Sequence, residues 1–391
     1  MVYTGLDSLS QTQKTRVCLL MGFLVFSPIS SLILIGILHF PFSLPELLFI
    51  PFIPYFKVIF ISEKINSRLL IAGIMLWLVL LGISLIVDEY SLKDILGSSR
   101  TYLYIFIFFS IFFSQNKNIL PEMYILSLGA LFGWSIDALY NFFILLTGEI
   151  SISYGPMIAL PIIIGYPYAI NHKKKSFLFF IISIIIGVIG TLRRVIAVSI
   201  IVFLISVLKD CFRSIKSVFR TLGITVSIGL ILGLSYPFIR QTIQETSHDM
   251  YVRIILKSED IFNGKGNSGD NLRNDIISNF YNNFLDYTFP HGYVSKNYGG
   301  ENTDGTYNDF PIREIAHTFS LLPLLFGIIY FLFKTIKCSS LIQKNRLPQS
   351  YFVLILGIFT IFILLNMEGS FLTFPYQTIY SGYILGTLSR I

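Results

Sequence analysis

The chain has 391 residues, of which 54% are hydrophobic and only 13% are charged. A soluble domain carries about 25% charged residues, so this composition excludes water-soluble globular folds, disordered scaffolds and nucleic-acid binders. The net charge of +7 does not indicate a polyanion partner, because excess Lys and Arg in a membrane protein usually set its topology. The three cysteines have no metal-ligand spacing. We therefore expect an all-α polytopic membrane protein without a metal site.

Twelve segments along the chain have the character of membrane-spanning helices. A transmembrane helix needs about 20 mostly apolar residues, with a range of about 17 to 25. In chain order the predicted segments are 17–38, 44–61, 69–87, 101–114, 121–146, 154–170, 177–190, 195–208, 221–239, 316–333, 350–367 and 370–388. The first segment is longer than the core of a signal peptide and lacks a small-residue cleavage site, so we expect it to remain a membrane helix.

Charge decides how the seventh and eighth segments are interpreted. Both are short, and the alternative is one long helix interrupted by Arg193 and Arg194. Two adjacent arginines at the bilayer midplane are costly, which favours two spans. Two spans also keep the basic runs 173–175 and 209–220 on the cytoplasmic side, as the positive-inside rule requires. The sequence thus predicts a multi-pass protein of the bacterial inner membrane with both termini in the cytoplasm.

One long segment between the predicted spans differs from the rest of the chain, because it holds 11 of the 22 acidic residues. It divides the chain into three parts: about nine helices over 1–239, a loop over 240–315, and about three helices over 316–391. Its apolar residues recur at helical spacing from about 271 to 286, and Pro290 and Gly292 follow. Loops beyond about 12–15 residues are usually functional or disordered. We expect a large, partly helical periplasmic loop with a function.

Four arginines are expected at the periplasmic face. Arg193 and Arg194 fall in a short turn between two spans, Arg273 in the loop helix and Arg313 just before the span at 316. Arginine forms bidentate contacts with phosphate, which makes these residues candidates for binding an anion. Structural alternatives are snorkelling for the adjacent pair, solvation for Arg273 and ion pairing with a neighbouring carboxylate for Arg313.

His317 follows Arg313 by four residues, so the two side chains share a face if a helix begins early enough. An imidazole changes its protonation near neutral pH, which suits a general base acting on a hydroxyl. The alternative is an interfacial histidine with a satisfied hydrogen bond, and His291 and His248 are loop residues with weaker claims. Nearby carboxylates are alternative bases or partners of Arg313: Asp270, Asp275, Asp309 and Glu314.

Two further acidic residues, Asp137 and Glu368, fall inside predicted spans. Charges inside a membrane are expensive, so both are candidates for a functional role. The structural alternatives are a helix-packing contact or an unrecognised helix end.

The order of these features resembles the O-antigen polymerase and ligase family of bacterial envelope enzymes. The turn 191–194, followed by an apolar helix, is similar to the Ser/Thr–Arg turn of this family. The stretch 268–273, which leads through the amphipathic helix to 290–292, is similar to the glycine–arginine start and the proline–glycine end of the family's loop helix.

The third match follows the loop. His317 with Leu321 and Gly327 resembles the histidine-led opening of the next span. Thr318 follows this histidine where ligases have Asn, which favours the polymerase over the ligase. Arg253, with a glycine eleven residues later, matches a spacing found in some polysaccharide polymerases, although about one such pair is expected by chance.

The resemblance implies a metal-independent and cofactor-free membrane glycosyltransferase. It would transfer a glycan chain from undecaprenyl diphosphate to a new lipid-linked repeat unit at the periplasmic face. The implied catalytic residues are His317, Arg273, Arg193 and Arg194, and the implied substrate-binding residues are Arg313, Arg253, Asp309 and Glu314. The implied partners are the lipid-linked donor and acceptor, membrane lipids and a chain-length regulator protein, with no nucleic acid. Loop tyrosines such as Tyr287 and Tyr293 either stack on sugar rings or form loop core.

Two other functions stay open. A ligase would move the finished glycan to lipid A core, and the histidine fits it while Thr318 does not. A lipid-linked oligosaccharide flippase, which is not an enzyme, also has about twelve spans but lacks a 76-residue acidic outside loop. The gel pattern of lipopolysaccharide from a deletion strain would separate these functions.

Overall fold

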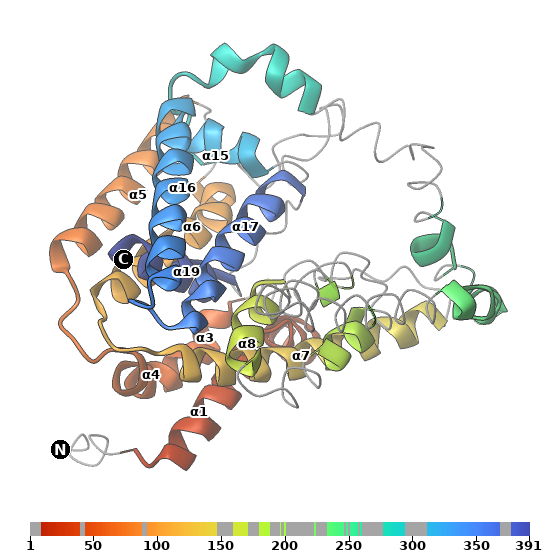
Figure 1. Cartoon of the computed structure of the whole chain (residues 1–391). Coiled ribbons are helices and arrows are strands. Elements are labelled where there is room, and N and C mark those ends of the chain that lie inside the picture. Colours follow the sequence, from red (N-terminus) through yellow and green to blue (C-terminus); the bar gives the residue numbers. More distant parts are fainter. Residues whose placement is uncertain are drawn as a thin grey trace.

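The computed structural model of the chain describes residues 9–39, 44–87, 92–146, 159–170, 180–187, 196, 199–200, 223, 233–245, 248, 251–256, 259, 277–293, 311–367 and 377–391. All regular structure in these ranges is helical (Figure 1). The expected all-α class is therefore confirmed for this part of the chain.

The first predicted span, 17–38, is not one continuous helix. Helix α1 runs over Gln11–Leu24 and starts with a capping box between Ser10 and Gln13. A turn separates it from the short helix α2, Ile29–Ser31, and from the π-helix Leu32–Ile37. Pro28 lies at this break as the residue before α2, because proline has no N–H to continue a helix.

Prolines also divide the second predicted span, 44–61. Helix α3 covers Pro45–Phe49, a 3-10 turn covers Ile50–Phe52, and α4 covers Ile53–Phe60. Each of the three pieces has a proline in its first two positions, where the missing N–H costs nothing. The hydropathy of this segment is that of one span, but its prolines make three short helices.

The next four helices correspond to the next four predicted spans, but the second of them begins at Leu92, nine residues before the predicted span 101–114, and the fourth is described only from Ala159. They are α5 (Ser67–Val87), α6 (Leu92–Ser114), α7 (Leu120–Leu146) and α8 (Ala159–Ile170). Of the next three predicted spans, 177–190 is helical in its described residues 180–187, while most residues of 195–208 and of 221–239 lie outside the described part.

The C-terminal part differs from the prediction at two points: its first predicted span is divided in two, and the long helix of that span ends at Gln343 rather than at 333. A short helix α15 (Pro311–Phe319) precedes the long helix α16 (Leu321–Gln343), whereas the sequence predicts one span over 316–333. Ser320 separates them with a φ of 74°, a left-handed conformation that ends the first helix. After a 3-10 turn (Gln349–Tyr351), the chain continues as α17 (Phe352–Met367) and α19 (Thr378–Arg390).

Three helical segments are long and apolar enough to cross a membrane: Ser67–Val87, Leu120–Tyr140 and Leu321–Gln343. Two of them, α5 and α16, expose large apolar side chains along their length, including Ile86 at 81% and Phe326 at 69% exposed. Water would not favour such surfaces, whereas lipid does. These helices indicate a membrane protein.

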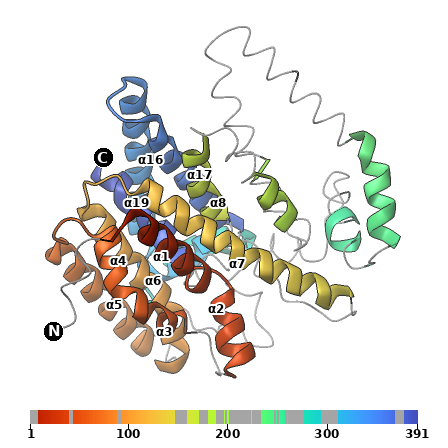
Figure 2. The ribbon, with the colours of Figure 1, turned by 90° about the horizontal axis from the view of Figure 1, so that it is seen from below.

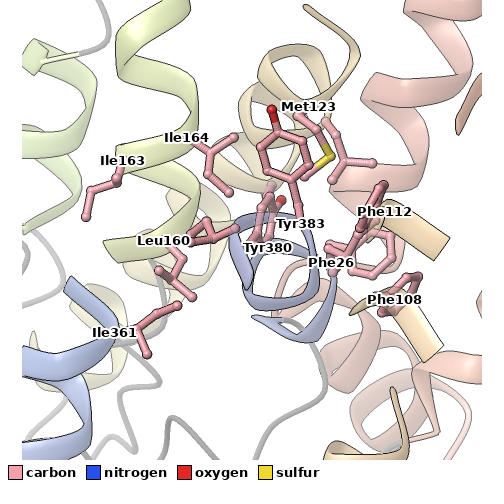
Figure 3. Close-up of a cluster of buried hydrophobic side chains, with 14 of the residues drawn as sticks. Phe26, Phe108, Phe112, Met123, Leu160, Ile163, Ile164, Ile361, Tyr380 and Tyr383 are labelled. Atoms are coloured by element: carbon pink, nitrogen blue, oxygen red, sulfur yellow. The ribbon is translucent and has the colours of Figure 1, made fainter. Parts of the chain in front are cut away.

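The core of the bundle forms around α19, which packs closely against α6 (Figure 1). The approach is tight because Gly382 faces α6: a Cβ there would lie 2.4 Å from the Cβ of Phe108. Figure 2 shows α1 lying alongside α7, and these two helices are in contact. Figure 3 shows buried side chains from α6, α7, α8, α17 and α19 meeting at one place: Phe108, Phe112, Met123, Leu160, Ile163, Ile164, Ile361, Tyr380 and Tyr383.

Residues 277–293 of the long loop pack onto this bundle. Residues 277–282 are helical, and a 3-10 turn over Phe284–Tyr287 follows. The predicted helix 271–286 is thus helical in its described second half, and its first half lies outside the described residues. Elsewhere in the loop, Tyr251–Leu256 form a π-helix. After the 3-10 turn 284–287, the chain passes through the turn 290–292, which contacts α15 and α5.

Candidate functional site

Helix α15 carries three polar side chains of the candidate site. Arg313, Glu314 and His317 all lie within Pro311–Phe319, so the helix begins early enough for Arg313 and His317 to share a face. The break at Ser320 places these residues on a separate short helix rather than in α16, which is long and apolar enough to cross a membrane. Figure 1 shows α15 beside one end of α16. Glu314 and His317 are each only 5% exposed.

One hydrogen bond determines which ring nitrogen of His317 carries the hydrogen, and the pKa determines the charge of the ring. Its Nδ1 lies 3.2 Å from the carbonyl oxygen of Gly292. Because a carbonyl only accepts, Nδ1 carries the hydrogen and Nε2 keeps its lone pair. The pKa of His317 is lowered to about 4, chiefly by burial and also by the charges of His291 and Arg313, against the opposing effect of the hydrogen bond to Gly292. At neutral pH the ring is therefore uncharged, with a base at Nε2.

The turn 290–292 holds His317 in place. The backbone N–H of His291 donates to the carbonyl oxygen of His317 at 2.8 Å. The two imidazole rings stack with their centroids 4.8 Å apart. His291, which the sequence gives only a weak claim, is therefore a direct neighbour of His317. In the sequence, the motif Pro290–His291–Gly292, part of the family resemblance, is the signal that points to His291.

Gly292 is required by this turn. Its φ is +87°, and a Cβ there would lie 2.2 Å from Oγ of Ser84 and 2.5 Å from the carbonyl oxygen of Leu80, both on α5. The next residue, Tyr293, donates its backbone N–H to Oγ of Ser84. The turn thus fits between α5 and α15.

Glu314 faces α6. Its Oε1 accepts a hydrogen bond of 2.9 Å from the hydroxyl of Tyr102. Burial raises the pKa of Glu314 to about 7, against the opposing effect of this hydrogen bond. Tyr102 also packs against the rings of Tyr293 and Phe319, with centroids 5.2 and 5.6 Å away. Sequence analysis missed Tyr102, because an aromatic residue in an aromatic-rich span gives no signal.

Arg313 faces the loop. Its Nε donates to the hydroxyl of Tyr287 at 2.8 Å. Tyr287 is buried in a small apolar cluster with Phe280, Ala316 and Leu321. The described hydrogen bond of Glu314 is with Tyr102, and the other carboxylate proposed as a partner of Arg313, Asp309, lies outside the described residues. Tyr287 and Tyr293 both belong to packed regions rather than to an exposed sugar-stacking surface.

The remaining predicted residues are not placed at this site. Seven of them lie outside the described residues: Arg193, Arg194, Asp270, Arg273, Asp275, Asp309 and Glu368. Arg253 lies in the π-helix Tyr251–Leu256, and its side chain is likewise outside the described part. Asp137 lies on α7, within the membrane-spanning segment. The site that the structure describes therefore consists of the α15 residues with Tyr102 and the turn 290–292.

An apolar pocket of about 360 Å³ adjoins the site. It lies between α6, α16, α17 and α19, and it reaches Tyr102 and the α15 residues Ile315 and Phe319. Its walls are almost entirely aliphatic and aromatic, as expected for a site that takes a hydrocarbon chain. A long apolar chain in this pocket would have one end beside Glu314.

Comparisons with protein-family models, with curated proteins and with solved structures give no match for this chain. The geometry around α15 therefore carries the functional argument.

Proposed function

We propose that the chain is a polymerase of lipid-linked surface polysaccharide. It would transfer a growing glycan from a polyprenyl diphosphate to the next lipid-linked repeat unit at the periplasmic side of the inner membrane. The observation that carries this proposal is His317: a neutral imidazole with a defined base at Nε2, on a helix next to an apolar pocket. The sequence resemblance supplies the reaction class.

The reaction would proceed by direct displacement. The acceptor hydroxyl oxygen attacks the anomeric carbon of the donor sugar, and its proton moves to Nε2 of His317. The bond between that carbon and the diphosphate oxygen breaks, and the diphosphate leaves with the electron pair. Arg313 stands one helical turn from His317, where a guanidinium can stabilise the leaving charge.

Other residues have supporting roles in this proposal. Arg193, Arg194, Arg273 and Arg253 would add positive charge around the diphosphate. Glu314, hydrogen-bonded to Tyr102, and Asp309 would orient sugar hydroxyls. Both carboxylates are also the rivals of His317 for the role of base.

The direct test replaces the base. His317→Ala should lower turnover by about 10²–10⁴-fold in a purified assay with lipid-linked repeat units, because that is the usual contribution of a general base. His248→Ala is the matched control, since it removes an exposed histidine elsewhere in the loop. Wild-type turnover by His317→Ala would refute the assigned base and transfer the role to Glu314 or Asp309.

A deletion strain tests the reaction class. The polymerase predicts lipopolysaccharide core that carries a single repeat unit. Bare core would instead indicate the ligase or the flippase, and would overturn the proposal even if His317 proved essential.

A further inference from the structure

Helix α6 carries polar side chains on two opposite faces at the same level. Tyr102 meets Glu314 on one face. Arg100 and Tyr104 are four residues apart and share another face, and each is two residues from Tyr102. Two residues correspond to about 200° of rotation in an α-helix. The second pair therefore points away from the candidate site.

Arg100 and Tyr104 meet the carboxylate of Glu46 at the start of α3. The hydroxyl of Tyr104 donates to Oε1 of Glu46, and Nη1 of Arg100 lies 3.4 Å from the same oxygen. The second oxygen, Oε2, is buried and accepts no hydrogen bond from the described residues. A buried carboxylate oxygen without a donor is costly, and a ligand hydroxyl would satisfy it.

A second apolar pocket begins at this carboxylate. Its volume is about 410 Å³, and it runs between α6 and the segment α3–α4. On α6 it is lined by Tyr104, Ile107, Phe108 and Ile111, which form a stripe at helical spacing. The helices α4 and α6 run in the same direction here, since Phe56 packs on Phe108 and Phe60 packs on Phe112. Glu46 therefore marks one end of the pocket, and Lys57 and Ile61 lie toward the other.

The two pockets lie back to back across α6. The pocket beside α15 contacts Tyr102, Ile105 and Phe106, and the second contacts the stripe that starts at Tyr104. Each pocket has apolar walls and a carboxylate–tyrosine pair at the same level of α6. At the second pocket, Arg100 pairs with the carboxylate of Glu46, and arginine is suited to phosphate.

We infer that the second pocket binds the hydrocarbon chain of the acceptor, with Arg100 on its phosphate and Oε2 of Glu46 on a sugar hydroxyl. This inference rests on the proposed function. Polymerisation joins the donor sugar next to its diphosphate to the acceptor sugar farthest from its lipid. The two lipid heads must therefore be held apart. Helix α6, about 10–12 Å across with its side chains, separates them.

Lipid stoichiometry tests this inference without any need for turnover. The purified protein is titrated with a polyisoprenyl phosphate and the bound molecules are counted by native mass spectrometry. The wild type should bind two molecules. Ile107→Trp fills the second pocket and should bind one, while Ile71→Trp, on the exposed face of α5, should still bind two.

Several outcomes would overturn the inference. One is a single molecule bound to the wild type, a result that does not depend on the folding of any variant. Others are two molecules bound to Ile107→Trp, or a diacyl phospholipid that displaces the probe from the second pocket at equal concentration. In the turnover assay, Ile107→Trp should raise KM for the acceptor at least tenfold and leave KM for the donor unchanged. Absence of turnover in the wild type would defeat the proposed function, whereas the binding count would stand.

Discussion

Two buried side chains on α15, His317 and Glu314, have pKa values shifted in opposite directions. Burial lowers the pKa of His317 from 6.5 to about 4 and raises that of Glu314 from 4.5 to about 7. Both residues are therefore neutral over most of the range between these values. Each shift corresponds to at most about 3.5 kcal/mol, at about 1.4 kcal/mol per pKa unit. The pair lets α15 remain buried without a net charge on either group.

The signs of the two shifts predict a pH dependence that single variants reveal. Between about pH 4 and 6.5 the unfolded state binds more protons at His317, so this residue makes stability fall as pH falls. Between about pH 4.5 and 7 the folded state binds more protons at Glu314, so this residue makes stability fall as pH rises. In the wild type the two slopes oppose each other.

We expect Glu314→Gln to become less stable from pH 6.5 to 4.5 and His317→Gln to become less stable from pH 4.5 to 6.5. The thermal unfolding midpoint of each variant in detergent, measured across this range, checks the prediction. Parallel slopes in the two variants would contradict it. The wild type serves as the control, with the flattest profile of the three.

Only some residues of this site can be predicted from the sequence. His317 and Arg313 are predictable, because their spacing along one helix is a local property. Tyr102 is 212 residues from Glu314 along the chain, and only the fold brings them together. His291 is intermediate: its string is visible in the sequence, but its stacking on His317 is a tertiary contact.

At the scale of elements, hydropathy located the apolar segments and local backbone chemistry changed their form. Proline turned the two first predicted spans into short pieces, and the left-handed residue Ser320 separated α15 from α16. A hydropathy profile detects neither the prolines that break a helix nor the backbone conformation of Ser320. The consequence is functional, because the break at Ser320 frees α15 to pack against α6 and the turn 290–292.

The docking of that turn predicts the effect of Gly292→Ala. The methyl group would meet Ser84 and Leu80 on α5 and would sit at a positive φ, a conformation that costs non-glycine residues about 1–3 kcal/mol. The variant should unfold at a lower temperature and lose turnover, because the carbonyl that orients His317 moves. Thermal unfolding and the turnover assay measure the two effects.

Gly82→Ala is the matched control for this prediction. Gly82 lies on the same helix as Ser84, and a Cβ there has nothing within 4 Å. Alanine also favours helix over glycine by about 1 kcal/mol, so this variant should be at least as stable as the wild type. Equal stability of Gly292→Ala and the wild type would show that the turn does not need its glycine.

At the scale of the whole molecule, the helices α5, α7 and α16 are long and apolar enough to indicate a membrane protein, and the direction in which the chain crosses the membrane is a prediction from charge. The basic runs near 173–175 and 344–346 are expected in the cytoplasm, since positive charge in short loops resists translocation. The loop 240–315 carries seven basic and eleven acidic residues and is long enough to translocate regardless of charge.

This orientation predicts the behaviour of reporter fusions. A periplasmic phosphatase fused after residue 290 should be active, and the same enzyme fused after Lys175 or Arg346 should be inactive, whereas a cytoplasmic fluorescent reporter should show the reverse. The first two predicted spans, 17–38 and 44–61, are broken by prolines. If neither crosses the membrane, the number of crossings falls by two, and every later segment keeps its predicted side. An inactive phosphatase at 290 would place α15 and His317 on the cytoplasmic face. Lipid-linked repeat units could not then meet the proposed base at the periplasmic side, so this single result would remove the proposed function.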